Sequence, residues 1–235
     1  MARVAVAAVA ALVLAGCSGS SGAGEGGTQT PRVRPDEGMR NTIKTALTQA
    51  GRTTEADIVT RGGTRLTTLR TPFLGAWRIV QVDYRQGAHP VMFHVAVGDG
   101  RAHLLTGTPE AFGTATTAAG TRVTDAASAV QLGRTYLETT RPPGKLTYVL
   151  DSADGIKFRP GITGSAAQKR DQILARYRSV IAAPAVTAEG AGFTVVAYVV
   201  QDRALQRREL TIAEQGTVKD KTTTLVPDLP VPYTL

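Results

Sequence analysis

Apolar residues recur at helical spacing in three stretches of the chain. The first stretch covers residues 36–50, where Asp36 can cap a helix and Gly51 can end it. The second covers residues 125–139, and the third covers residues 165–181. In each stretch the apolar residues form one stripe and polar residues take the remaining surface. We therefore expect three amphipathic helices, each packed with one side on another element.

The stripes of the two later helices differ in the size of their residues. The stripe of the second helix is built from Ala126, Ala129, Val130, Gly133, Tyr136 and Leu137. The larger stripe of the third helix is built from Ile173, Leu174, Tyr177, Val180 and Ile181. The sequence Arg141-Pro142-Pro143-Gly144 ends the second helix, because proline lacks the amide hydrogen that a helix interior needs.

Alternating apolar and polar residues after Pro72 predict three antiparallel strands over residues 77–84, 91–97 and 101–106. The sequence Asp99-Gly100 is a strong signal for a two-residue hairpin turn between the last two strands. This turn sets the pairing register, with Val95 opposite Leu104 and Val97 opposite Ala102 on the buried face. Residues 107–121 are rich in glycine and threonine and are predicted to form a loop or a domain junction.

A second group of strands is predicted in the last third of the chain. A short strand covers residues 146–150. Residues 193–200 are apolar on both faces and suit a central strand, whereas the threonine-rich residues 217–226 suit an edge strand. Between them, residues 206–209 interrupt the alternation, which predicts a bulge or an exposed stretch.

These elements predict an α+β fold in which amphipathic helices pack on antiparallel meander sheets. We assign residues 36–120 to a first α+β half and residues 121–235 to a second. Each half has a helix first and a three-stranded meander after it. That order resembles cystatin-like or nuclear-transport-factor-like domains in topology alone, and such a resemblance implies no function.

The N-terminus carries a pattern typical of export. Arg3 gives a positive start, and residues 4–14 are an unbroken apolar run. As a helix this run would be about 16 Å long, too short for a bilayer core of about 30 Å, so we interpret residues 1–16 as a cleaved signal peptide and not as a permanent span.

The next residues, Leu14-Ala15-Gly16-Cys17, resemble the lipobox of bacterial prolipoproteins. The resemblance covers residues 1–17 only. It implies cleavage between Gly16 and Cys17, a diacylglyceryl group on the Cys17 sulfur, and a lipid-anchored protein on the extracytoplasmic side of the cell membrane. The alternative is an ordinary secretory signal followed by an incidental thiol. Cys17 is the single cysteine of the chain, so it has no intramolecular disulfide to form.

Residues 17–35 form the predicted link between this anchor and the folded part. Most of residues 18–30 are glycine or serine, which is typical of a flexible tether. A tether of about 18 residues has a root-mean-square reach of roughly 21 to 25 Å. The folded part can therefore stand clear of the lipid head groups.

Composition and charge limit the classes of protein and of binding partner that the sequence allows. With 42% hydrophobic and 20% charged residues the chain is neither a disordered acidic tail nor a multi-spanning membrane protein. The net charge of +8 is compatible with an anionic envelope component as partner, although arginines dispersed over a solvated surface are the stronger explanation of this charge. Nucleic acid is a poor candidate partner, because aromatic residues make up only 5% of the chain and exported proteins do not meet it.

The sequence contains no motif that names a reaction or a cofactor. Neither G-x-S-x-G nor S-x-x-K occurs, and Walker, Rossmann, EF-hand and C-x-x-C patterns are absent. The predicted hairpin makes His94 and His103 diagonal neighbours on the face opposite the valines, so they are weak metal candidates. The hairpin supplies no further ligand beside them, and we interpret them as two half-exposed strand histidines.

We interpret the chain as a lipid-anchored envelope protein that binds other envelope proteins or anionic envelope components without catalysis. Its predicted contact surface is formed by Arg203, Arg207 and Arg208. The first alternative is a carrier for a lipid or another small apolar ligand. The ligand would lie in a cavity left by the small side chains of the helix over residues 125–139. An envelope enzyme, whose reaction the sequence does not indicate, ranks below both. The sequence indicates no oligomeric state.

Replacing the predicted lipid attachment site tests the anchor. In Cys17→Ala the sulfur that would carry the lipid is gone, so we expect the chain to leave the membrane pellet and to lose labelling by a palmitate analogue. Wild-type protein is the control. A Cys17→Ala chain that still sediments fully with membranes contradicts the lipobox interpretation.

Overall fold

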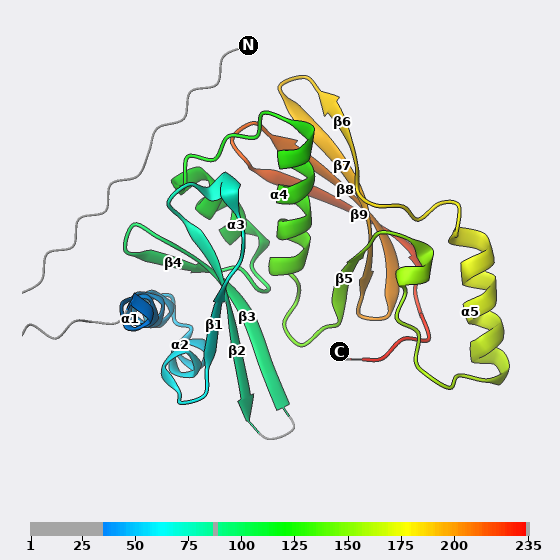
Figure 1. Ribbon diagram of the computed structural model, residues 1–235, viewed down its shortest axis with the longest axis horizontal. Helices are drawn as coiled ribbons and strands as arrows, with labels where there is room; N and C mark the ends of the chain where they lie inside the picture. The colour runs from blue at the N-terminus through cyan, green and yellow to red at the C-terminus, as the bar shows by residue number, and fades with distance from the viewer. Residues whose placement is uncertain (1–34, 87–88, 234–235) are drawn as a thin grey trace, which may run out of the picture. The chain divides into compact units, whose positions relative to one another are not determined.

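The computed structural model describes residues 35–86 and 89–233, apart from the side chains of four residues at the edges of these ranges. The predicted signal peptide, Gly16, Cys17 and most of the tether lie outside the described residues, and so does the side chain of Asp36. The described residues belong to one compact unit with an α+β fold (Figure 1). No described helix is long and apolar enough to span a membrane.

Five α-helices and two antiparallel sheets make up the described part of the chain. The helices are α1 (Pro35–Gln49), α2 (Thr53–Thr60), α3 (Pro109–Ala118), α4 (Ala126–Thr139) and α5 (Gly164–Tyr177), with short 3-10 turns η1 (Pro72–Leu74) and η2 (Ala153–Gly155). The first sheet has the order β1 (Arg65–Thr68), β2 (Arg78–Gln86), β3 (His89–Gly98), β4 (Arg101–Leu104). The second has the order β5 (Thr147–Leu150), β7 (Gly192–Gln201), β8 (Ala204–Ala213), β9 (Val218–Val226), and β6 (Ala185–Glu189) also pairs with β7.

The hairpin between β3 and β4 has the predicted register. Val95 pairs with Leu104 and Val97 pairs with Ala102, which confirms the prediction. Asp99 and Gly100 both have positive φ, at 50° and 69°, as a two-residue turn with this twist requires. β1 and α2 were not predicted from the sequence, because each is short and carries too few apolar residues for a clear period.

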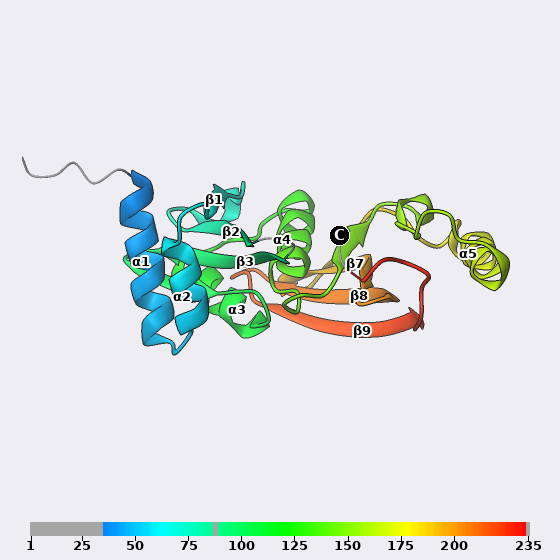
Figure 2. The ribbon, with the colours of Figure 1, turned by 90° about the horizontal axis from the view of Figure 1, so that it is seen from below.

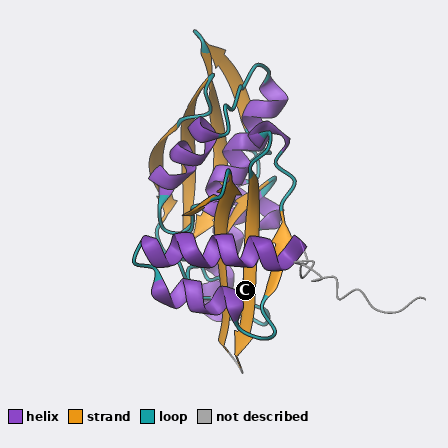
Figure 3. Ribbon diagram, turned by 90° about the vertical axis from the view of Figure 1, so that its left-hand side faces the viewer, coloured by secondary structure: helices purple, strands orange, loops and turns teal. Residues whose placement is uncertain are grey.

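The first sheet is covered by helices on both faces. On one face, α1 and α2 bury Ile43, Leu47 and Val59 against Val80 and Val95. Figure 3 shows these two helices crossing the strands of the sheet. On the opposite face, Ile79 of β2, Ala96 of β3 and Leu105, which follows β4, join a larger cluster that contains residues of α3 and α4. Figure 2 shows α1 and α2 side by side at the first sheet, apart from α4.

The prediction of a loop over residues 107–121 was wrong, because α3 lies there. Pro109 stands at the start of the helix, where its missing amide hydrogen costs nothing. Phe112 and Ala115 are buried in the large cluster. Glycine and threonine weaken the intrinsic helix preference of this segment, and burial against neighbouring elements outweighs that weakness.

Helix α4 begins after Asp125, whose side chain accepts a hydrogen bond from the Ser128 amide, and its predicted range is confirmed. Ala126 is exposed, contrary to the predicted stripe, whereas Leu132 is fully buried although it lies off that stripe. Gly133 faces the second sheet so closely that an added Cβ would lie 3.1 Å from Cδ1 of Leu210. The predicted ligand cavity at this point is therefore filled by sheet side chains.

The second sheet follows the prediction for its two best-marked strands. β7 is central and β9 lies at the edge. The prediction missed β6, and β8 pairs with β7 without interruption through residues 206–209. A register shift occurs instead between Leu205 and Gln206, in the pairing of β8 with β9.

Helix α5 is shorter than predicted and ends at Tyr177. Ile173 and Tyr177 are buried as expected, with Leu229 and Val231 of the C-terminal segment in the same cluster. Val180 and Ile181 of the predicted stripe both lie beyond the end of the helix, and Val180 is 45% exposed, whereas Ile181 is buried in the same cluster.

Hydrophobic packing continues across the predicted boundary at residue 120. The largest cluster contains Trp77 and Phe112 from before that point and Leu132 and Leu210 from after it. The core between the two sheets is thus shared by both segments of the chain.

Candidate functional site

A pocket of about 880 Å³ opens beside the end of the hairpin formed by β2 and β3. Its walls come from the start of α2, the residues around β1, the ends of β2 to β4, and the connection from α4 to β5. The pocket is open to solvent on one side and is not an enclosed cavity. Its volume falls within the range of roughly 300 to 1,000 Å³ that small-molecule sites occupy.

The pocket exists because β4 is shorter than β3. β4 pairs only with the last four residues of β3, and the Leu105 amide then donates to the His94 carbonyl at 2.9 Å. Beyond this point β3 is paired with β2 on one side, and its other edge faces the pocket. The connection from α4 to β5 passes over that edge with Pro142 and Pro143.

Apolar side chains line much of the interior. Val91, Phe93 and Leu104 come from one face of the first sheet, and Met92 comes from the opposite face of β3, because side chains alternate along a strand. Leu146, which directly precedes β5, also contributes to the lining. The pocket therefore contains apolar surface on both sides of a strand edge.

The charged groups at the pocket are mainly basic. The basic side chains are Arg52, Arg65, Arg85, Arg141 and Lys145, and the acidic ones are Glu55 and Asp83. Lys145 is paired with Asp202 at 2.8 Å. Asp83 accepts a hydrogen bond from Gln81 at 2.8 Å. The positive excess favours a ligand with negative charge.

His94 lies behind the wall of this pocket. Its side chain is only 4% exposed, so the prediction of a half-exposed residue was wrong. Its backbone amide donates to Oγ1 of Thr106 at 2.9 Å, and that hydroxyl donates to the Thr139 carbonyl at 3.2 Å. Burial, together with the nearby positive charge of Arg141, lowers the pKa of His94 to about 4. The imidazole is therefore neutral at physiological pH.

His103 is on the predicted face of the hairpin, opposite Ala96. Its ring stacks on Trp77, with centroids 5.6 Å apart and planes 9° apart. Burial, and secondarily Arg101, lowers the pKa of His103. Among the described residues, no three His, Cys, Asp or Glu side chains are grouped so that they could hold a metal ion.

The predicted contact residues Arg207 and Arg208 lie on opposite faces of β8, because they are consecutive in a strand. Arg208 is 15% exposed and pairs through two nitrogens with Asp220 of β9, which is 10% exposed. It also donates to Gln201 at 3.0 Å. Arg207 pairs with Glu209 on the other face, where both side chains are about one-third exposed.

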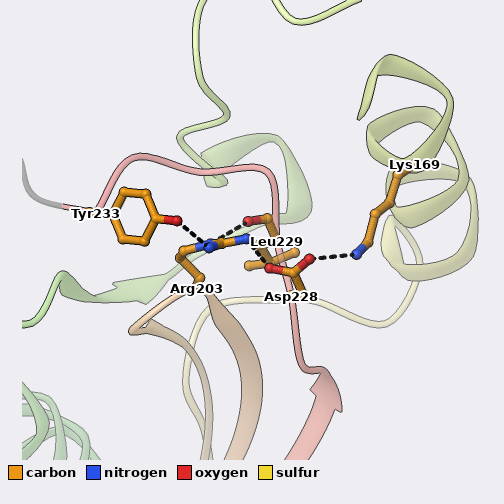
Figure 4. Close-up of polar contacts among 5 residues, drawn as sticks. All are labelled: Lys169, Arg203, Asp228, Leu229 and Tyr233. Atoms are coloured by element: carbon orange, nitrogen blue, oxygen red, sulfur yellow. Dashed lines mark hydrogen bonds and ion pairs between the residues drawn. The ribbon is translucent and has the colours of Figure 1, made fainter. Parts of the chain in front are cut away.

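Arg203 is engaged with the C-terminal segment, in the turn between β7 and β8. It is paired with Asp228 and donates to the Tyr233 hydroxyl at 2.7 Å, and Asp228 also accepts from Lys169 of α5 at 3.4 Å (Figure 4). The Leu229 amide donates to the Arg203 carbonyl. The structure therefore does not bring Arg203, Arg207 and Arg208 together on one surface.

Comparisons with protein-family models, with curated proteins and with solved structures found no match to this chain. No sequence pattern indicates the pocket, because its lining comes from several separate segments with no fixed spacing between them. The one signal is the sequence from Arg141 to Gly144, which by itself predicts only the end of a helix.

The two neighbouring arginines of β8 are expected to differ sharply in their effect on stability. Arg208→Ala leaves the Asp220 carboxylate buried without its partner, so we expect a loss of about 3 to 5 kcal/mol in the free energy of unfolding. Arg207→Ala removes a more exposed pair and should cost less than about 1 kcal/mol. Urea denaturation of both variants measures the difference, and equal losses would contradict the assigned burial.

The buried histidine predicts a specific dependence of stability on pH. Since the pKa of His94 is lowered to about 4 in the folded chain, the unfolded chain binds the extra proton first as the pH falls. The contribution of His94 to stability is therefore full above pH 6.5 or so and is lost towards pH 4, at up to roughly 1.4 kcal/mol per pH unit.

Urea denaturation at a series of pH values tests this expectation, with His94→Gln as the comparison. The variant should show a shallower fall in stability below pH 6.5 than the wild type, whatever its stability at neutral pH. Imidazole NMR signals provide a second readout. A His94 titration midpoint of 6 or above in the folded chain would disprove the shift.

Proposed function

We propose that the chain is a lipid-anchored, non-catalytic binding protein of a bacterial cell envelope that takes a small amphiphilic molecule into the pocket beside β3. The observation that carries the proposal is the solvent-open pocket of about 880 Å³, which is lined by both apolar and basic side chains. A mostly apolar interior with a few polar groups is typical of small-molecule sites. Of the hypotheses made from the sequence, we therefore prefer the carrier hypothesis. The proposed ligand site lies beside β3, whereas the sequence predicted a cavity at residues 125–139.

The hydrogen bonds of the pocket wall favour binding over acid–base chemistry. The Thr106 hydroxyl is occupied by the His94 amide and the Thr139 carbonyl. Asp83 accepts from Gln81. These groups are held by the protein itself, whereas a catalytic acid or base has to be directed at the substrate.

Anchoring is proposed from the N-terminal sequence. The lipobox-like Leu14-Ala15-Gly16-Cys17 supports lipid attachment at Cys17, and the glycine- and serine-rich residues after it support a flexible link. A binding protein tethered in this way would meet envelope amphiphiles near the membrane surface where they are concentrated. Anionic envelope components suit the basic side chains at the pocket.

Filling the pocket with a larger side chain tests the proposal. Val91 lines the pocket and is 37% exposed, whereas Val180 is 45% exposed and lies outside the pocket lining. Val91→Trp should therefore reduce ligand occupancy at least severalfold, and Val180→Trp should leave it unchanged. Both substitutions are made in the full chain carrying Cys17→Ala, so that no acyl chain of the anchor competes for the pocket.

The measurement is mass spectrometry of lipid and small-molecule extracts from the three purified proteins, the third being the chain with Cys17→Ala alone. We expect one amphiphile at close to one molecule per chain in that protein and in the Val180→Trp protein. Empty chains in all three, or equal occupancy in the two tryptophan variants, would refute the proposed pocket function.

A further inference from the structure

We infer that the pocket selects its ligand by a carboxylate or phosphate group, which the guanidinium of Arg141 binds while the apolar part of the ligand lies along the edge of β3. This inference rests on the proposed function and goes further by naming the chemical class of the ligand. It assigns the role of specificity-determining residue to Arg141. The same chemistry would serve a fatty acid or a phosphorylated lipid.

The backbone of Arg141 is fixed by the end of α4 and by the loop that follows β4. The Gly107 amide donates to the Arg141 carbonyl at 2.9 Å. Pro142 and Pro143 come next and restrict the backbone further. The backbone from which the Arg141 side chain extends is thus fixed at the pocket before a ligand arrives, so binding does not have to order this segment of the chain.

The side chain of Arg141 has a weak partner. Its Nη2 contacts Sδ of Met92, and a thioether is a poor hydrogen-bond acceptor. Asp83 and Glu138 influence Arg141 through space, yet no carboxylate within the described ranges forms an ion pair with it. Desolvation is the main cause of the lowered pKa of Arg141.

A guanidinium that has lost water without gaining a carboxylate is costly, and an anionic ligand would remove that cost. Two other partly buried arginines have such partners, whereas partly buried Arg40 donates to the backbone carbonyls of Val59 and Thr64. Arg208 is paired with Asp220 and Arg203 with Asp228. Arg141 differs from them by facing an open pocket, where a ligand can supply the missing carboxylate or phosphate.

The surroundings of Arg141 suit a molecule with one charged end. Met92 and Leu146 provide apolar surface near it, and Phe93 and Leu104 extend that surface on the other side of the strand edge. Arg52, Arg65 and Arg85 add positive charge to the pocket lining and would attract anions before contact. Glu55 and Asp83 oppose this field and are outnumbered by the basic side chains.

Isothermal titration with four matched probes tests the inference. Dodecanoate, dodecyl phosphate, dodecanol and dodecylammonium share one apolar chain and differ in the charge of the head group. They are titrated, below their micelle concentrations, into the full chain carrying Cys17→Ala. We expect one or both anions to bind at least about tenfold more tightly than dodecanol, and dodecylammonium to bind most weakly.

The comparison of dodecanoate with dodecyl phosphate identifies which of the two anionic groups the site prefers. Arg141→Gln should weaken binding of the preferred anion about tenfold and leave dodecanol binding unchanged. Arg141→Lys keeps the charge but loses the planar fork, so it should restore part of the preference. Arg122→Gln, which changes an exposed arginine outside the pocket lining, is the matched control and should behave as the wild type.

The outcomes separate this inference from the proposed function. Dodecanol and the anions binding with equal affinity, or an anion preference that persists in Arg141→Gln, overturns the role of Arg141 and leaves the pocket function standing. Failure of the unsubstituted pocket to bind any of the four probes counts against the pocket function itself. Unchanged near-ultraviolet circular dichroism in Arg141→Gln and Arg141→Lys excludes misfolding as the cause of a loss.

Discussion

The packing of helices α3 and α4 between two antiparallel sheets is the constraint on which the described structure depends. One hydrophobic cluster joins Ile79 and Leu105 of the first sheet and its margin to Val195 and Leu210 of the second through these helices. A helix that packs against neighbours on two sides needs apolar residues outside a single stripe. Leu132 of α4 lies outside the predicted stripe and is fully buried for this reason. Either sheet without this layer would expose a broad apolar face to water.

The same layered packing creates the pocket. The elements that cover the two faces of the first sheet do not close over the end of its long hairpin, because β4 stops at Leu104 and the chain turns away to form α3. The strand edge left beside β3 is covered only in part, by the connection that leaves α4. The pocket therefore lies at the edge of the first sheet, and its shape depends on the residues at which the neighbouring strands and helices end.

Ion pairing explains why a positively charged chain does not present its predicted contact arginines as a free basic surface. Arg208 ties the edge strand β9 to β8, and Arg203 ties the C-terminal segment to the turn between β7 and β8. Arg207 has a partner on its own strand. The pocket differs because its basic side chains outnumber its acidic ones, so an incoming anion there gains contacts that the protein does not already make.

The sequence determined the parts of the structure that local patterns control. The α+β class, the ranges of α1 and α4, the register set by Asp99-Gly100, and the central and edge strands of the second sheet all follow from periodicity and turn chemistry. Short or weakly patterned elements did not follow, and α3 is the clearest case, since its burial comes from residues distant in the sequence. For the same reason the stripe of α4 was only partly correct.

Only the tertiary structure decided which side chains share a site. Arg207 and Arg208 are adjacent in sequence and lie on opposite faces of a strand, whereas Arg141 and Met92 are 49 residues apart and in contact. Sequence spacing reports neighbours along one helix face or one strand face. The meeting of several chain segments at a sheet edge depends on where each element stops and how the layers pack, and no local pattern in this sequence encodes that.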